Sequence, residues 1–243
     1  VKEVSARDRH TMILKNDETL WACGYNGYYQ FGNGTKTDST TPVQVLTNVK
    51  SVAVSNTYSM ALKTDGTLWA CGRNIYGNLG DGTKEDVKEW KQVMENVKSV
   101  FIGGTSSFMI KTDNSLWSCG YNNYGILGDG TKVTQTTPVK IMEGVKDGSV
   151  DYLGYRAFFL KNDNTLWGCG NNLSGQLLGD GTTGWEEKGA VKILDNIADV
   201  AAGDSHSIIA KTDGTFWSCG SNDNGQLGNN ATTSSNTWIS IDF

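Results

Sequence analysis

The chain has 243 residues, of which 37% are apolar, and its formal net charge is −5 with a pI of about 5.1. This acidic balance argues against a nucleic-acid-binding protein, which would carry a basic patch. No run of roughly 18 apolar residues is present to insert into a membrane. Thirty glycines and only two prolines, Pro42 and Pro138, predict many turns between many strands.

One phrase, Thr-Leu-Trp-Ala-Cys-Gly, recurs five times with small changes, and its tryptophans are 48, 48, 50 and 50 residues apart. A regular period of this size indicates one supersecondary unit repeated in tandem. The copies are Thr19–Gly24, Thr67–Gly72, Ser115–Gly120, Thr165–Gly170 and Thr215–Gly220. We therefore predict a single array over residues 1–243, with repeats at 1–48, 49–96, 97–144, 145–196 and 197–243.

Each repeat contains four predicted strands. In the first repeat an alternating stretch, Val1–Ala6, precedes a second apolar run, Thr11–Leu14. A tight turn that begins with Asp follows, most clearly as Asp65-Gly66 in the second repeat, and apolar runs around such a turn favour a hairpin. The third strand is the tryptophan phrase, and a long polar loop separates it from the last strand. The last strands are predicted at Pro42–Leu46, Trp90–Met94, Pro138–Met142, Gly189–Leu194 and Trp238–Asp242.

Four antiparallel strands in a unit of about 40–50 residues are typical of a β-propeller blade. In the third strand, alternation places Trp21 and Cys23 on one face and Leu20 and Ala22 on the other. Both faces are apolar, so both need a cover, which the neighbouring blades of a propeller supply. The predicted fold is an all-β propeller of five four-stranded antiparallel blades, either a five-bladed ring or part of a longer ring.

The tryptophan phrase contains all five cysteines and five of the eight tryptophans. No Cys-x-x-Cys spacing occurs, and packed sheets about 10 Å apart are too distant for neighbouring copies to form disulfides. We predict structural side chains of the core rather than metal ligands, and no cofactor. The predicted core residues are Trp21, Cys23, Trp69, Cys71, Trp117, Cys119, Trp167, Cys169, Trp217 and Cys219.

Other features that suggest chemistry have simpler explanations. His10 and His206 begin the second strands of repeats one and five, and we expect structural roles in which they bind local backbone. The Gly-Asp-Gly-Thr loops at 80–83, 128–131 and 179–182 resemble part of a calcium loop, but calcium loops alternate several acidic oxygens over about a dozen residues. We predict an Asx-turn there. No phosphate-binding loop or nucleophile elbow occurs, so we do not expect an enzyme.

The stretch from Leu62 to Thr83 reads Leu-Lys-Thr-Asp-Gly-Thr-Leu-Trp-Ala-Cys-Gly-Arg-Asn-Ile-Tyr-Gly-Asn-Leu-Gly-Asp-Gly-Thr. It resembles the regulator-of-chromosome-condensation repeat, as do 203–207 and 225–228, and the resemblance covers the whole chain. It implies a β-propeller, usually of seven blades, so five repeats depart from the family's count. Family members exchange guanine nucleotides on small GTPases or, among bacterial members, inhibit β-lactamases.

The resemblance implies a protein partner, but the residues that carry either activity are not matched here. Tyr58, Tyr152 and Tyr155 match the inhibitors' aromatic first turns only in part. The Asn-, Thr- and Lys-rich composition resembles bacterial members on secreted or surface proteins, so we expect an extracellular or cell-surface location.

Residues that differ between the repeats are the candidates for recognition, because the recurrent residues build the blade. Two segments diverge, namely the turn between the first and second strands and the loop after Cys-Gly. The recurring Tyr28, Tyr76 and Tyr124 are expected to pack under their own loops. Tyrosine and arginine are favoured at interfaces, so we predict a non-enzymatic protein-binding scaffold that uses loops on one face. The candidate contact residues are Arg7, Arg9, Tyr58, Arg73, Tyr152, Tyr155 and Arg156.

Two alternatives remain open. In the first alternative, the array is a structural module of a bacterial surface or filament assembly. Its rim strands would then pair with neighbouring copies, and Trp90, Trp185 and Trp238 would form contacts. Otherwise it is a glycan-binding propeller that uses exposed aromatic side chains.

Overall fold

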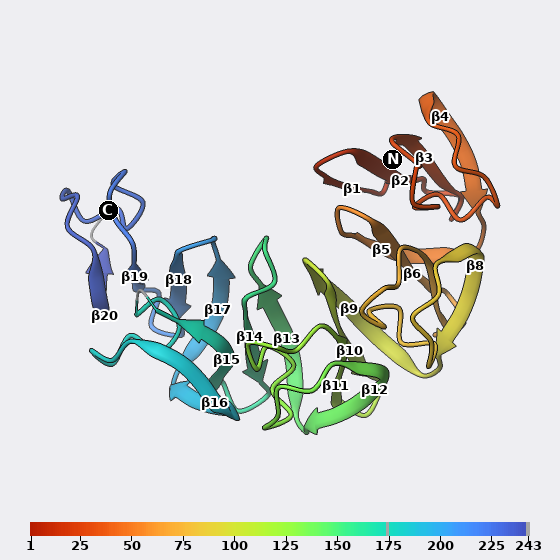
Figure 1. The fold of residues 1–243 in the computed structure, drawn as a ribbon. Helices are drawn as coiled ribbons and strands as arrows, with labels where there is room; N and C mark the ends of the chain where they lie inside the picture. Colours follow the sequence, from red (N-terminus) through yellow and green to blue (C-terminus); the bar gives the residue numbers. More distant parts are fainter. Residues whose placement is uncertain (174, 242–243) are drawn as a thin grey trace. The chain divides into compact units, whose positions relative to one another are not determined.

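The computed structural model describes residues 1–173 and 175–241. Within the second range, only the backbone of residues 185–188 is described. All of its regular elements within those ranges are β-strands, and none is a helix that could cross a bilayer. Twenty strands form five four-stranded sheets, each made of four consecutive strands (Figure 1). These sheets are the five predicted propeller blades, which confirms the fold class.

The strands follow the repeats. Blade 1 contains β1 (Glu3–Arg7), β2 (His10–Leu14), β3 (Leu20–Gly24) and β4 (Ser39–Leu46). Blade 2 contains β5 (Val49–Val54), β6 (Tyr58–Lys63), β7 (Leu68–Gly72) and β8 (Val87–Met94). Blade 3 contains β9 (Val97–Gly103), β10 (Ser106–Lys111), β11 (Leu116–Gly120) and β12 (Gln135–Met142). Blade 4 contains β13 (Val145–Val150), β14 (Arg156–Lys161), β15 (Leu166–Asn172) and β16 (Gly184–Leu194). Blade 5 contains β17 (Ile197–Ala202), β18 (His206–Lys211), β19 (Phe216–Gly220) and β20 (Ser235–Ile241).

The chain divides into two compact units. The first unit consists of residues 1–113, 117–121 and 134–139, and therefore holds blades 1 and 2 and most of blade 3. The second unit consists of 114–116, 122–133 and 140–243, and holds blades 4 and 5 together with the long loop of blade 3.

The Asp turn and the tryptophan phrase form one hydrogen-bonded structure. In blade 2 the Asp65 carboxylate accepts bonds from the backbone N–H and the hydroxyl of Thr67, at 2.9 and 2.7 Å. The Thr67 hydroxyl in turn accepts the indole N–H of Trp69 at 2.8 Å, while the Lys63 ammonium lies 4.3 Å from the ring centroid. Blades 1, 4 and 5 repeat these contacts. The Thr-x-Trp spacing thus closes the hairpin in these four blades.

This arrangement corrects the prediction that the five tryptophans are buried in the core. Trp21, Trp69, Trp117, Trp167 and Trp217 are half-buried, because each indole lies at the hairpin edge of its blade under a lysine stem. Cys71, Cys119, Cys169 and Cys219 are fully buried as predicted, whereas Cys23 is half-buried. All five thiols are free.

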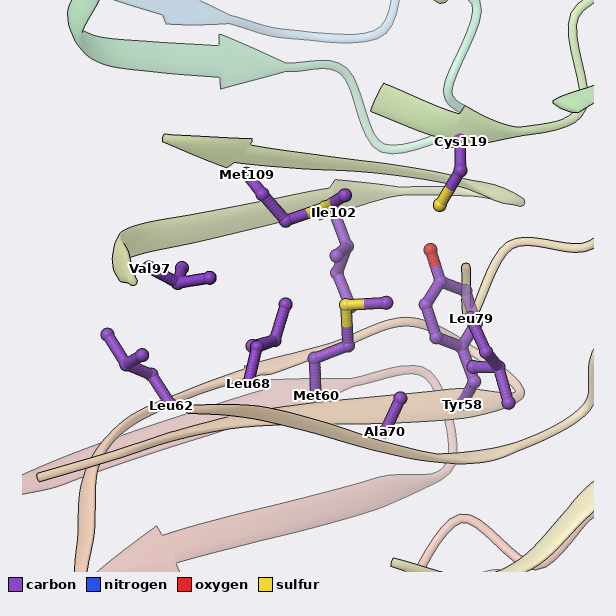
Figure 2. Close-up of a cluster of buried hydrophobic side chains, with 10 residues drawn as sticks. All are labelled: Tyr58, Met60, Leu62, Leu68, Ala70, Leu79, Val97, Ile102, Met109 and Cys119. Carbon is purple, nitrogen blue, oxygen red and sulfur yellow. The ribbon is translucent and has the colours of Figure 1, made fainter. Parts of the chain in front are cut away.

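The hydrophobic core lies between neighbouring blades. In the first unit Met60, Leu62 and Leu68 of blade 2 pack against Ile102 and Met109 of blade 3 (Figure 2). The same positions of blade 1, Met12, Leu14 and Leu20, pack against the opposite face of blade 2. In the second unit Phe158, Leu160 and Leu166 of blade 4 pack against Ile197 and Ile209 of blade 5. Apolar residues on both faces of a blade are therefore explained by two neighbours, as the alternation predicts.

In blades 1 to 4, a backbone carbonyl of the long loop is bound by the following blade. The Gln30 carbonyl accepts bonds from the Ser59 hydroxyl at 2.9 Å and the Cys71 thiol at 3.3 Å. The Asn78 carbonyl accepts bonds from the Ser107 hydroxyl and the Cys119 thiol. The Gln176 carbonyl accepts bonds from the Ser207 hydroxyl and the Cys219 thiol. In blade 4, where alanine replaces the serine, Cys169 alone donates to the Ile126 carbonyl. The repeated cysteine is thus a small donor buried between two blades.

The last strand of each blade begins three to five residues earlier than the sequence indicates. In blade 2, Val87 pairs with Gly72 before a bulge. The backbone N–H of Trp90 donates to the Gly32 carbonyl of blade 1 at 3.3 Å. The polar start of the strand has no apolar pattern to predict it, because it pairs with the preceding blade's loop instead of burying an apolar face. Asp242, the predicted end of the last strand, lies outside the described residues.

These interfaces predict that substitution by alanine at one repeat position lowers the free energy of unfolding by different amounts in different blades. Leu68→Ala removes a fully buried side chain from the blade 2–blade 3 core and should lower the free energy of unfolding by about 2–5 kcal/mol. Phe216 occupies the same place in blade 5 but is 38% exposed, so Phe216→Ala should cost about 1 kcal/mol. Urea unfolding of both variants checks this, and equal losses would contradict the interblade core.

Candidate functional site

Two divergent segments of each blade lie at the same end of its sheet. In blade 2, Tyr58 pairs with Gly72, and the Arg73 N–H donates to the Thr57 carbonyl at 3.0 Å. The turn before Tyr58 and the loop after Gly72 therefore lie together. Only glycine fits at position 72, because φ is +110° and a Cβ would lie 2.6 Å from the Tyr58 Cα. The repeated Cys-Gly thus brings the two divergent segments into contact.

In the first unit these segments form two sets of aromatic and arginine contacts that border one cleft, and together we call them the Arg–Tyr surface. The Arg9 guanidinium lies 5.7 Å from the Tyr25 ring centroid, and Tyr25 meets Tyr28 edge to face at 5.8 Å. Tyr28 carries the Arg73 guanidinium of blade 2 at 4.8 Å. Tyr76 then meets Tyr121 of blade 3 at 5.0 Å. Its members are Arg9, Tyr25, Tyr28, Arg73, Tyr76 and Tyr121.

The recurring tyrosines therefore contact more than their own loops. Tyr28 and Tyr76 each reach the first loop residue of the next blade, and in the second unit Tyr124 meets Tyr155 edge to face at 5.3 Å. Their rings stabilise the loops across the blade boundary and remain half-buried, so part of each is open to solvent.

Two clefts open beside the Arg–Tyr surface. The first, of about 220 Å³, lies between blades 1 and 2 and is lined by Asp8, Arg9, Tyr28, Asn56 and Thr57. The second, of about 180 Å³, lies between blades 2 and 3 and is lined by Thr57, Arg73, Ile75, Tyr76, Asn78 and Thr105. Because Thr57 lines both, the clefts are neighbours.

The arginines are concentrated at this end of the blades. The chain has four arginines, Arg7, Arg9, Arg73 and Arg156, and each lies in or next to one of the divergent segments of its own blade. Arg9 forms an exposed ion pair with Asp8 at 3.1 Å. Arg73 forms no ion pair with a described carboxylate and rests on Tyr28 instead. Arg7 is half-buried, and its Nη1 donates to the Ile102 carbonyl of blade 3 at 3.0 Å, so it also holds the unit together.

The prediction that Tyr58 contacts a partner is wrong. Its side chain is fully buried, and its hydroxyl donates to the Ser106 carbonyl of blade 3 at 3.0 Å and lies 3.0 Å from the Ser107 hydroxyl. Burial raises the pKa of the phenol well above its usual range. Tyr58 points into the blade boundary because it is the first residue of β6, not part of the turn.

The same correction applies to Arg156, which is the first residue of β14. It is fully buried, and its guanidinium donates to the carbonyls of Gly203, Asp204 and His206 in blade 5. Its Nη1 also lies 3.6 Å from the buried Asp151 carboxylate. Burial lowers the pKa of Arg156 and raises that of Asp151, while their mutual attraction opposes both shifts. Arg156 therefore joins two blades and is not available to a partner.

The remaining candidates of the second unit lie on the turn of blade 4. Tyr152 and Leu153 are exposed by 40% and 47%, and Tyr155 is half-buried against Tyr124. The structure thus brings Tyr152 and Tyr155 to one turn at this end of blade 4. Trp185, a predicted assembly contact, has a side chain outside the described residues. Trp90 and Trp238 are half-buried against the loops of the preceding blades, and Trp238 donates to the Leu178 carbonyl.

His10 has a structural role, but its partner is a side chain of the next blade, not local backbone. Its Nε2 lies 2.9 Å from the Ser59 hydroxyl, whose proton is donated to the Gln30 carbonyl. Nε2 must therefore carry the proton, and Nδ1 is buried with no partner. Burial lowers the pKa of His10 to about 4, so the ring is neutral at pH 7. His206 is half-buried, and burial lowers its pKa as well.

The Gly-Asp-Gly-Thr loops form the predicted Asx-turns. The Asp81 carboxylate accepts the N–H and the hydroxyl of Thr83, and it also receives the Asn74 amide and Lys91. Burial raises the pKa of Asp81, but these bonds outweigh that effect and hold it below its usual value. The described residues contain no cluster of three metal-ligating side chains.

Comparison with known proteins agrees with the repeats and the blades. The family model of the RCC1-like domain matches residues 1–241. The chain belongs to the RCC1-like domain family. Its fold is similar to human WBSCR16, with 20% identity, a TM-score of 0.83 and coverage of 99% of this chain and 66% of that chain. It is also similar to the yeast RCC1 protein Prp20 in complex with Kap60, with 20% identity and a TM-score of 0.80 over 99% and 61% of the two chains.

A second structure of Prp20, from Saccharomyces cerevisiae, gives 20% identity, a TM-score of 0.80 and coverage of 99% and 63%. The binding properties of that protein to Gsp1p and histones were studied together with its structure. This RCC1-like chain thus spans slightly less than two thirds of the length of each relative. At this identity the likeness shows the fold of the RCC1-like chain, not its partners.

Sequence reasoning did not single out several residues of the site. Tyr25, Asn56, Thr57, Ile75 and Thr105 line the clefts or extend the Arg–Tyr surface. Their sequence signal is their spacing, since Thr57 and Thr105 occupy the same place in successive repeats.

The buried neutral imidazole predicts a pH dependence of stability. The unfolded chain takes up a proton on His10 near pH 6.5 and the folded chain only near pH 4, so stability is lost as the pH falls through this window. The loss attributable to His10 should be about 2 kcal/mol at pH 5. Urea unfolding at pH 7 and pH 5 should show that His10→Gln removes most of this loss and His206→Gln removes less. An unchanged pH dependence in His10→Gln would contradict the burial of this ring.

Proposed function

We propose that this chain is a non-enzymatic, protein-binding scaffold and that a partner protein docks on the Arg–Tyr surface of the first unit. The observation that carries the proposal is Arg73, a guanidinium stacked on Tyr28 between two clefts with no described carboxylate to neutralise it. Arginine and tyrosine at the centre of a concave surface are the residues that most often dominate binding energy.

The reactive side chains of the repeats support a scaffold. Burial raises the pKa of Cys119 and Cys219 to about 12 and that of Cys71 and Cys169 above the usual range, so these thiols stay protonated at neutral pH. His10 is neutral, buried and bound to Ser59. These five side chains are therefore used in packing one blade against the next.

The relatives support a protein partner in general terms. The yeast RCC1 protein Prp20 is bound to Kap60 in one of the similar structures. Whether this chain works outside a bacterial cell, as its composition suggests, or assembles with itself stays a prediction.

The proposal predicts that one charge on the Arg–Tyr surface controls binding. A partner isolated with the wild-type chain and then purified should bind Arg73→Gln at least about tenfold more weakly, a loss of about 1.4 kcal/mol, because the desolvated guanidinium contact is removed. Isothermal titration calorimetry measures the loss, and the melting temperature should fall only slightly, because the substitution removes the stacking of Arg73 on Tyr28 but no ion pair with a described carboxylate.

Lys50→Gln is the matched control. It removes one exposed charge from the start of β5, at the end of blade 2 that lies away from the turn before Tyr58. Equal affinity for wild type and Lys50→Gln with a loss in Arg73→Gln supports the proposal. Wild-type affinity in Arg73→Gln, Arg9→Gln and Tyr28→Ala would show that the partner docks elsewhere.

A further inference from the structure

The two clefts of the first unit are copies of one site, displaced by one repeat. Arg9, Tyr28 and Thr57 line the first cleft, and the residues one 48-residue repeat later, Thr57, Tyr76 and Thr105, line the second. Each cleft is bounded by the turn of one blade, the long loop of the same blade and the turn of the next. Because Thr57 lines the end of the first cleft and the start of the second, one continuous ligand can enter both.

We infer that these clefts receive an extended acidic polypeptide segment, which would place side chains in successive clefts and a carboxylate on Arg73. This inference rests on the proposed function and names the kind of partner that it requires. A segment of this kind matches the polar groups, the local charge and the repetition of the site.

The polar groups of the two clefts need both donors and acceptors from a ligand. Arg9 in the first cleft and Arg73 in the second offer N–H donors. The Oδ1 atom of Asn56, which lines the first cleft, is buried and has no hydrogen-bond partner. A buried acceptor without a partner is costly, and a ligand N–H would satisfy it. A polypeptide backbone supplies carbonyl oxygens and N–H groups in alternation, whereas a phosphate or carboxylate ion alone supplies only acceptors.

The local charge selects an acidic segment. The chain carries a net charge of −5, yet the charged side chains that line the two clefts are Arg9 and Arg73 against a single carboxylate, Asp8. A carboxylate can bind the Arg73 guanidinium in a fork-to-fork geometry without displacing a described ion pair. Arg73 also remains on the Tyr28 ring, which holds the guanidinium in place.

The second cleft adds an apolar contact. Ile75 on its rim is 41% exposed, and the half-buried Tyr76 forms its wall. An aliphatic or aromatic side chain of the segment would cover Ile75. A nucleic-acid strand would also bring negative charge, but it offers no aliphatic side chain for Ile75, so we argue for the polypeptide.

A random peptide library tests the inference. A display library with about ten random residues per peptide, long enough to cross two clefts in extended form, is selected on the wild-type chain. The selected sequences should be enriched in Asp and Glu. One of them, synthesised with a fluorescent label, should bind at least about tenfold more weakly to Arg73→Gln and when its acidic residues are changed to amides. Asn56→Ala should weaken binding several-fold, and Lys50→Gln should have no effect.

Three results would overturn the inference. The first is a set of selected peptides without enrichment in Asp and Glu. The second is a labelled peptide that binds Arg73→Gln as tightly as it binds the wild-type chain. The third is a thymidine oligonucleotide of similar length that binds more tightly than any selected peptide. If a purified protein partner still depends on Arg73 in these cases, the proposed function stands and only the acidic extended segment is wrong. If neither partner nor peptide depends on Arg73, both fail.

Discussion

The hydrogen bonds between each long loop and the following blade are the constraint on which the rest of this structure depends. A loop of irregular backbone folds back over the blade boundary, and its carbonyl at Gln30, Asn78 or Gln176 is buried there. An unpaired buried carbonyl would cost stability, so the next blade must supply a donor small enough to fit between sheets. The serine of the second strand and the cysteine of the third strand supply it.

This constraint fixes the position of the candidate site. Once its carbonyl is bound by the next blade, the loop that precedes it has little freedom, and Tyr28 is held against Arg73. The buried Asn26 and Asn74 add internal bonds to the same loops. The Arg–Tyr surface is therefore a pre-organised surface on rigid supports, which lowers the entropic cost of binding a partner.

Most of the fold could be predicted because one phrase repeats at nearly constant spacing. Alternation in the third strand gave both apolar faces correctly, since Leu68 and Cys71 are both buried against different neighbours. The site was predicted less well. Divergence between repeats predicts exposure for Tyr58 and Arg156, yet both are buried, as is His10 at the same repeat position, for which a structural role is expected.

These three side chains diverge because each fills the blade boundary in a different way. His10 binds a serine hydroxyl, Tyr58 binds a carbonyl and a serine, and Arg156 binds three carbonyls. A sequence without its neighbours in space cannot show which of two adjacent residues faces the partner and which faces the next blade. Arg9 and Tyr58 lie one residue apart in repeat position, and only Arg9 is exposed.

Alkylation of the native chain, read by mass spectrometry at each cysteine, tests the central claim most directly. Thiols that donate to a buried carbonyl between blades should be protected, and burial keeps them protonated and unreactive. The account predicts that Cys23, which is half-buried, is labelled first, while Cys71, Cys119, Cys169 and Cys219 react only on unfolding. Labelling of these four as fast as Cys23 under native conditions would contradict it.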